Sequence, residues 1–250
     1  MKHALLSCFV LSLFPLLIHP ATTKAQGVSD QDSLALVALY DSTGGNNWDN
    51  NTNWLSTKVA DWYGVTVQNG NVTQLNLASN NLDGPIPTDI GDLTSLDTLV
   101  LTNKKLEGNI PGEIGSLSKL ELLYLNDNQL PGSIPSQLWN LTELKILNLA
   151  YNQLEGSVPS DVTNLTNLIA FGIQENQFTD FPDLSSLSNI KYLEVDVNHF
   201  TFEDIEPNIG VASEEFDYAP QAKVGELKNY QVEEGASQTL SVDVAGSHNT

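Results

Sequence analysis

A repeat of 24 residues is the feature that most restricts what this chain can fold into. A segment that begins near Leu75 recurs five more times with little change. The equivalent positions follow at steps of 24 residues and once, at the end, of 22: Leu99, Leu123, Leu147, Phe171 and Leu193. One repeat of this length cannot bury its own apolar edge, so successive repeats must stack on one another. The sequence therefore predicts a solenoid of six stacked coils.

The residue types within each repeat predict the path of one coil. Leu75 and Leu77 flank a single residue, so both point inward from a short strand, and successive strands would form one parallel sheet. Later apolar positions such as Leu82 return the chain around the same core, and motifs such as residues 84–87 favour an extended path. The fifth repeat lacks this motif, which predicts a local change of coil shape near residues 178–184.

One polar position recurs after each strand. A buried side-chain amide there can bond the unpaired backbone groups of a tight turn, coil after coil. The expected ladder residues are Asn80, Asn128, Asn152, Asn176 and Asn198. Lys104 takes this place in the second repeat, so we expect the ladder to be interrupted there.

The pattern LxxLxLxxNxLxGxIPxxLGxLxx in residues 72–209 is similar to the plant-type leucine-rich repeat. The resemblance implies an α/β repeat solenoid, a leucine-rich-repeat horseshoe with a parallel concave β-sheet and an N-terminal, helical and Trp-rich cap. It also implies a bacterial secreted or surface protein that resembles the ectodomain of leucine-rich-repeat receptor-like proteins. The kinase domain of such receptors is not part of the resemblance, because no glycine-rich loop, HRD or DFG motif is present.

Residues 26–71 are expected to cap the first coil, because the open end of such a stack exposes core. Leu34, Val37 and Ala38 lie at helical spacing and predict a helix over Ser29 to Tyr40. Three tryptophans in this segment are expected to cover the core by aromatic burial, and an exposed, sugar-binding cluster is the alternative. They are Trp48, Trp54 and Trp62.

The repeat decays after Phe200. Residues 203–205 are expected to form a last short helix, and residues 210–230 a linker. Residues 231–250 alternate polar and apolar side chains, which is typical of the first strands of a truncated, immunoglobulin-like β-sandwich module. Acidic residues are dense between Glu194 and Asp217, but no DxDxDG loop is present, so a solvated acidic face is favoured over a metal site.

Residues 1–25 combine Lys2, an apolar run and a small-residue stretch, and are read as a signal peptide. The alternative, a membrane anchor, needs roughly 20 apolar residues, and this run is shorter and contains Pro15. We therefore expect a secreted or cell-surface protein that is not inserted in the membrane once the signal is removed.

Charge and motif content exclude several functions. The chain has 10 basic residues, all Lys, against 31 acidic ones, and a net charge of -21, which argues against nucleic-acid binding. No nucleophile, phosphate-loop or metalloprotease motif is present, so we expect neither an enzyme nor a cofactor.

The residues between the inward leucines are expected to point outward across the concave face. Tyrosines, amides and carboxylates there suit a protein or peptide partner, and this surface should prefer neutral or basic partners. The alternatives are a non-binding spacer or adhesin stalk and a glycan-binding module. The candidate binding residues are Tyr124, Asn126, Asp127, Asn148, Tyr151, Gln174, Glu175, Tyr192, Glu194 and Asp196.

Overall fold

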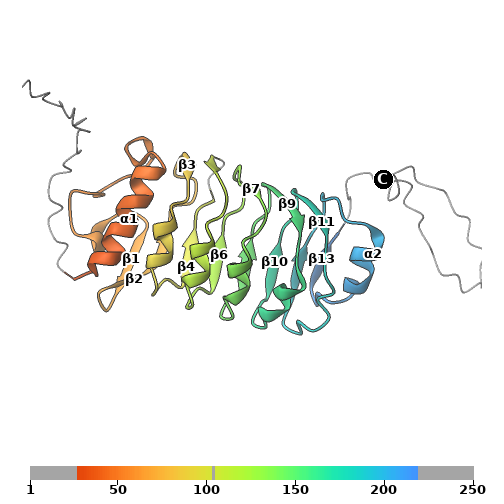
Figure 1. Ribbon diagram of the computed structural model, residues 1–250. Helices are drawn as coiled ribbons and strands as arrows, with labels where there is room; N and C mark the ends of the chain where they lie inside the picture. The colour runs from red at the N-terminus through yellow and green to blue at the C-terminus, as the bar shows by residue number, and fades with distance from the viewer. Residues whose placement is uncertain (1–26, 103–104, 219–250) are drawn as a thin grey trace, which may run out of the picture.

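The computed structural model describes residues 27–102 and 105–218 as an elongated stack of coils (Figure 1). The expected signal peptide, the ladder position of Lys104 and the expected module at residues 231–250 lie outside the described residues. No helix in the described part of the chain is both long and apolar enough to cross a membrane.

The inward leucines build one main sheet along the stack. Leu75 lies opposite Leu99, Leu99 opposite Leu123, and the same register continues to Leu193. All neighbouring strands are parallel except the first pair, β1 and β2, which form an antiparallel hairpin. In spatial order the strands are β1 (Val65–Gln68), β2 (Asn71–Asn76), β4 (Thr98–Val100), β6 (Leu122–Tyr124), β8 (Ile146–Asn148), β10 (Ala170–Gly172), β12 (Tyr192–Glu194) and β13 (Glu215–Asp217).

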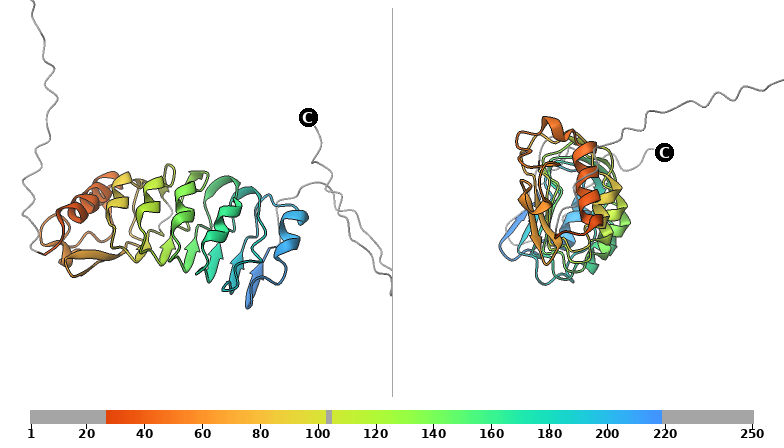
Figure 2. Two further views of the ribbon diagram at one scale, coloured as in Figure 1. Left: turned by 60° about the horizontal axis from the view of Figure 1, so that its bottom comes forward. Right: turned by 90° about the vertical axis from the view of Figure 1, so that its left-hand side faces the viewer.

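Short helices lie on the side of the stack opposite the main sheet, as the end-on view in Figure 2 shows. Four coils carry one 3₁₀ helix each, and each helix begins directly after a proline. These helices are η3 (Thr88–Asp92), η4 (Gly112–Ser116), η5 (Ser136–Asn140) and η6 (Ser160–Asn164). The described chain between Phe181 and Ile190 forms no helix, so the fifth coil differs in shape from the other four.

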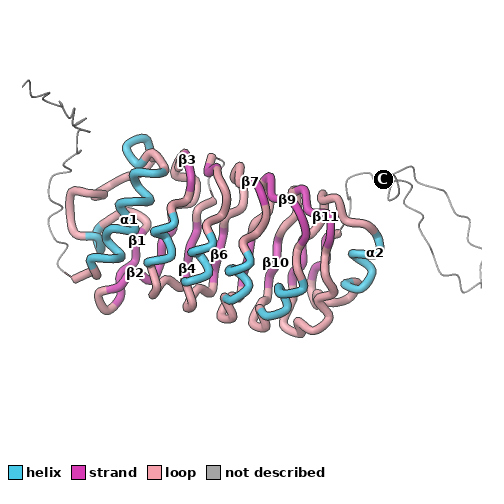
Figure 3. Tube along the Cα trace, in the orientation of Figure 1, coloured by secondary structure: helices cyan, strands magenta, loops and turns pink. Residues whose placement is uncertain are grey.

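Two smaller sheets join the return segments of neighbouring coils (Figure 3). Their strands are β3 (Gly84–Pro85), β5 (Leu106–Glu107), β7 (Pro131–Gly132), β9 (Gln153–Ser157) and β11 (Gln177–Asp180). Glycines allow the 3₁₀ helices to approach closely: a Cβ at Gly91 would lie 2.5 Å from the carbonyl oxygen of Glu113, and one at Gly115 would lie 2.4 Å from that of Gln137. Trp139 occupies the third equivalent position and is buried.

The N-terminal cap begins with α1 (Asp30–Ser42), and Ser29 caps it through its hydroxyl. The expected apolar face was wrong, because Leu34 is 65% exposed, whereas Ala35, Leu36 and Leu39 are fully buried. Packing against the first coil selects the buried face of this helix, and the spacing of apolar residues in so short a segment fits two faces. Within the cap, the buried carboxylate of Asp32 accepts a hydrogen bond from the N–H of Val72 at 2.7 Å.

The cap tryptophans are buried, with exposed fractions of 5 to 6%. Their rings contact one another and Tyr40 at centroid distances of 4.7 to 5.7 Å. Each indole N–H donates to a backbone carbonyl, of Thr43, Tyr63 or Thr57. The alternative of an exposed, sugar-binding tryptophan cluster is therefore wrong, because these side chains belong to the core. The short helices η1 (Gly45–Asn47) and η2 (Val59–Asp61) complete the cap.

The C-terminal end of the stack extends further than the repeat predicts. The expected helix forms as α2 (Phe202–Ile205), followed by η7 (Glu206–Asn208). Glu215–Asp217, which were expected in the linker of residues 210–230, instead form β13 beside β12, with Phe216 opposite Leu193. Phe216 supplies the inward apolar side chain that a further strand needs, so the main sheet extends beyond residue 209.

Candidate functional site

A ladder of asparagines holds the turn that follows each strand. In the fifth coil, Nδ2 of Asn176 donates to the carbonyl oxygens of Leu149 and Ile173, both at 3.0 Å. Its Oδ1 accepts from the N–H of Leu154 at 2.9 Å. Neighbouring ladder residues repeat this pattern in their own coils: Asn128, Asn152 and Asn198.

Successive ladder residues share carbonyl groups. The carbonyl oxygen of Leu149 accepts from both Asn152 and Asn176, each at 3.0 Å. Asn80 differs from the others because its side chain bonds the backbone of Asn50 in the N-terminal cap: Oδ1 accepts from the N–H, and Nδ2 donates to the carbonyl oxygen. The ladder thereby connects the coils to one another and, at its first member, to the cap.

The residue before each ladder asparagine adopts a left-handed backbone. We call these positions the turn residues; they are Ser79 (φ 52°), Asp127 (57°), Tyr151 (55°), Glu175 (53°) and Val197 (52°). Each lies three residues after the last residue of its strand, so together they line the finishing edge of the concave sheet. This conformation is uncommon for residues other than glycine, asparagine and aspartate.

The structure brings Tyr151 together with four of the candidate carboxylates. Its ring is 49% exposed. Partial burial and the charges of four neighbours raise the pKa of the Tyr151 phenol; the neighbours are Glu175, Asp196, Asp127 and Glu194, in order of effect. We call these four carboxylates the acidic rim. An exposed aromatic ring within the acidic rim is the most distinctive feature of the concave face.

Two members of the acidic rim are held by amides. Asp127 accepts from Nδ2 of Asn126 at 2.9 Å, and Glu194 accepts from Nε2 of Gln174 at 2.5 Å. Within the described residues, neither Glu175 nor Asp196 accepts a hydrogen bond from another side chain, although the carboxyl of Asp196 accepts one from its own backbone N–H. They are therefore the rim members most available to a partner.

The surroundings of Asp196 disfavour the ionised form of its carboxyl. Burial and then the charge of Asp217 raise the pKa of its carboxyl, with smaller contributions from Glu175 and Glu194. A cation placed here would relieve the repulsion between these carboxylates. Asp217 belongs to β13 and was missed at the sequence level, although Phe216 at a step of 23 residues from Leu193 indicates the additional coil.

Other candidate residues have different surroundings. Tyr192 donates its hydroxyl to Glu214 at 3.1 Å, and Lys191 contacts the same carboxylate at 3.2 Å. This pair lies at the starting edge of the sheet, so Tyr192 is held away from the acidic rim. Asn148 uses its Oδ1 to accept from the N–H of Ala150, and Tyr124 is half-buried on β6.

The outward positions of β10 carry almost no side chain. These residues, Ala170 and Gly172, were not among the predicted site residues. A Cβ at Gly172 would lie 3.1 Å from Oε1 of Gln174 and 3.3 Å from Oδ1 of Asn148. The alternation of residues along the strand could have identified both positions. Within the described residues, no three His, Cys, Asp or Glu side chains are grouped so as to hold a metal ion.

Comparison with known proteins identifies the repeat. The family model described as Leucine Rich Repeat matches residues 71–93, 119–141 and 143–165. No curated protein sequence matches the chain significantly.

Solved structures of plant receptor ectodomains are similar to this one. The leucine-rich-repeat ectodomain of GASSHO1/SCHENGEN3 from Arabidopsis thaliana, in complex with CASPARIAN STRIP INTEGRITY FACTOR 2, is 32% identical with a TM-score of 0.63. The similarity covers 68% of this chain but only 21% of that one, so the chain spans about a fifth of that ectodomain.

The ectodomain of the Arabidopsis thaliana receptor kinase SOBIR1 is 28% identical with a TM-score of 0.58, over 69% of this chain and 94% of that one. The ectodomain of the Arabidopsis receptor kinase HAESA, in complex with an IDA peptide hormone, is 25% identical with a TM-score of 0.53, over 68% and 33%. The chain folds as a leucine-rich-repeat solenoid whose repeats are similar to those of plant receptor ectodomains.

Proposed function

We propose that this chain is an extracellular recognition module that binds a protein or peptide on its concave face, without catalysing a reaction. The observation that carries the proposal is the exposed ring of Tyr151 within the acidic rim. A flat aromatic ring buries a large area on contact, and the surrounding carboxylates orient the partner by charge.

The acidic rim favours a partner with basic side chains. Neither Glu175 nor Asp196 accepts a hydrogen bond from another described side chain, and burial and like charges raise the pKa of Asp196. A lysine or arginine of the partner placed between them would replace repulsion with charge-assisted hydrogen bonds. Lys145 and Lys191, the lysines nearest to these strands in sequence, contact Glu121 and Glu214 at the starting edge instead.

The similar structures support binding in general. Two of the plant ectodomains were solved with a bound factor or peptide hormone. The expected signal peptide supports export, and the similar plant proteins are receptor ectodomains, which agrees with an extracellular location.

Capture from an array of extracellular proteins and synthetic peptides tests the proposal. We expect the full chain to capture at least one basic protein or peptide, and the double substitution Tyr124→Ala with Tyr151→Ala to weaken capture at least tenfold. Tyr63→Ala is the matched control, because Tyr63 is a 41% exposed tyrosine in the N-terminal cap.

Unchanged capture by a folded double variant would contradict the placement of the site on the concave face. The absence of any captured partner would favour the alternative of a structural spacer or adhesin stalk. Capture of polysaccharide alone, lost in the double variant, would favour the glycan-binding alternative.

A further inference from the structure

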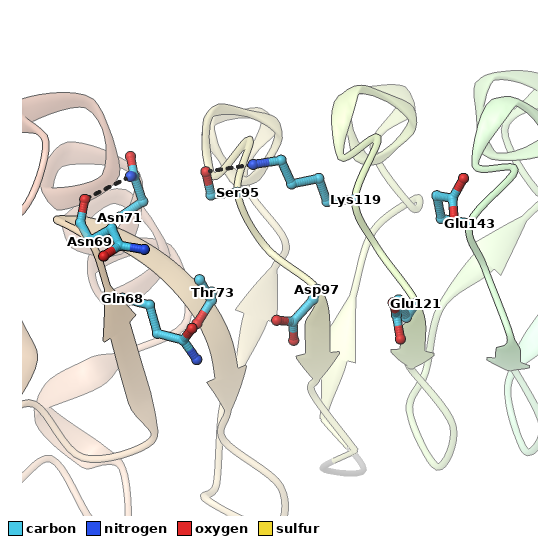
Figure 4. Close-up of a pocket in the computed structure, with 9 residues that line it drawn as sticks. All are labelled: Gln68, Asn69, Asn71, Thr73, Ser95, Asp97, Lys119, Glu121 and Glu143. Atoms are coloured by element: carbon cyan, nitrogen blue, oxygen red, sulfur yellow. Dashed lines mark hydrogen bonds between the residues drawn. The ribbon is translucent and has the colours of Figure 1, made fainter.

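A second, separate site is indicated by a polar groove at the starting edge of the main sheet. The groove has a volume of about 420 Å³ and lies beside the β1–β2 hairpin (Figure 4). Amide side chains of the hairpin form one wall: Gln68, Asn69 and Asn71. It lies at the opposite end of the strands from the turn residues, so a ligand here would not occupy the acidic rim.

The repeat arranges the rest of the groove as two rows of polar side chains. One row lies at the starting edge of the sheet and contains Thr73 in β2, Asp97 directly before β4 and Glu121 directly before β6, each one coil apart. The other row contains Ser95, Lys119 and Glu143, with the same spacing. Neighbouring strands lie about 4.8 Å apart, so each row presents a polar group at that interval. A row of this kind suits an extended ligand with regularly spaced polar groups.

The hydroxyl of Thr73 is the strongest sign that the groove takes a ligand. Its Oγ1 is buried and has no hydrogen-bond partner within the described residues, although its own carbonyl accepts from the N–H of Asp97 at 2.8 Å. A buried hydroxyl without a partner destabilises the fold, so such groups in native proteins call for an explanation. Because this oxygen has almost no exposed surface, a ligand hydroxyl supplies the missing hydrogen bond only once a neighbouring side chain of the groove moves aside.

The chemistry of the lining disfavours two classes of ligand and suits a ligand with many hydroxyl groups. Apolar ligands are disfavoured because every lining side chain is polar or charged. Anions are disfavoured because the lining residues include three carboxylates but only one ammonium group, that of Lys119, which contacts Oγ of Ser95 at 3.5 Å. Lys145, which is not a lining residue, neutralises one of these carboxylates by its contact with Glu121 at 2.6 Å. Hydroxyl groups of a neutral ligand can donate to the carboxylates and accept from the amides and the ammonium.

We propose that this groove binds a neutral saccharide chain along the two rows, independently of the concave-face site. The ligand is held by hydrogen bonds to Asp97, Glu143 and the hairpin amides, with the Thr73 hydroxyl paired only when the saccharide is bound. No aromatic ring lines the groove, so hydrogen bonds alone give the selectivity.

Titration of the full chain with cellohexaose, mannohexaose and chitohexaose, followed by calorimetry, tests the proposal. We expect at least one of the three to bind with saturation. Thr73→Val should weaken that binding about tenfold without lowering the free energy of unfolding, because the lost hydroxyl makes no hydrogen bond in the free protein. Glu143→Gln, an exposed change that preserves shape, should also weaken it several-fold and keeps the test valid if the valine variant fails to fold.

Three results would overturn the inference. The first is that none of the three saccharides binds at millimolar concentration. The second is that Thr73→Val and Glu143→Gln both bind as the unchanged protein does. The third is that the polyamine spermidine binds in the groove in preference to the saccharides. Tyr151→Ala should leave saccharide binding unchanged, which separates this site from the one on the concave face.

Discussion

Replacing the buried amide of Asn176 by alanine should destabilise the whole solenoid. The side chain is 8% exposed, and its Oδ1 is the acceptor for the N–H of Leu154, which is fully buried. Asn176→Ala leaves this N–H without its acceptor, at a cost of about 1–3 kcal/mol. The carbonyls of Leu149 and Ile173 each lose one donor but keep a second, from Asn152 and Asn198.

The net loss is therefore dominated by the N–H of Leu154, which loses its acceptor, because the carbonyls of Leu149 and Ile173 each keep a donor. The two carbonyls that lose one of their donors add about 1 kcal/mol to this cost. The free energy of unfolding should therefore fall by about 2–4 kcal/mol in total. Urea denaturation followed by circular dichroism measures this loss, and an unchanged m-value would show that the cooperative unit is the same.

Asn164→Ala is the matched control for this experiment. Asn164 is an exposed asparagine one coil earlier, in η6, and its removal should change stability by less than about 0.5 kcal/mol. If Asn176→Ala unfolds at the same urea concentration as Asn164→Ala, the argument that the ladder stabilises the stack is refuted.

Two further substitutions test the packing and the charge of the molecule. Gly115→Ala should lower the free energy of unfolding by about 1–3 kcal/mol, because the new methyl would lie 2.4 Å from the carbonyl oxygen of Gln137. Gly112→Ala is the control and should cost less, because its methyl meets only the movable end of the Gln137 side chain. Asp196→Asn should stabilise the fold by about 0.5 kcal/mol at neutral pH. Burial and neighbouring charges raise the folded-state pKa of Asp196 above the ordinary 3.8, so its ionised form is disfavoured in the fold. The gain should be present above the folded-state pKa and should vanish as the pH falls below about 3.8, where the carboxyl is protonated in both states; a gain that persists at low pH would contradict this cause.

Much of the fold could be predicted from the repeat, because every coil must bury apolar side chains at the same equivalent positions. Leu75, Leu99 and their equivalents could be assigned to the core, and the outward residues between them to the concave face, from alternation alone. The buried face of α1 could not, because packing against the first coil decides between Leu34 and Leu36.

The end of the solenoid was missed for a different reason. Phe216 replaces leucine, so the recurrence that identifies the other coils is weak at β13. The acidic environment of Asp196 was therefore underestimated, since Asp217 belongs to that additional strand. The hydrogen bond from Tyr192 to Glu214 could not be predicted for the same reason, because Glu214 directly precedes β13.

The turn residues serve recognition at a cost to the stability of the fold, because their backbone is left-handed. A residue other than glycine held in this conformation destabilises a fold by about 1–2 kcal/mol, and Tyr151 and Glu175 both adopt it, with φ of 55° and 53°. Glycine would relieve that strain but would present no side chain to a partner. The solenoid thus displays Tyr151, the more exposed of the two exposed candidate tyrosines, where the backbone least favours a side chain. Its binding surface can change from one coil to the next without changing the core, and each side chain displayed in this way carries its own stability cost.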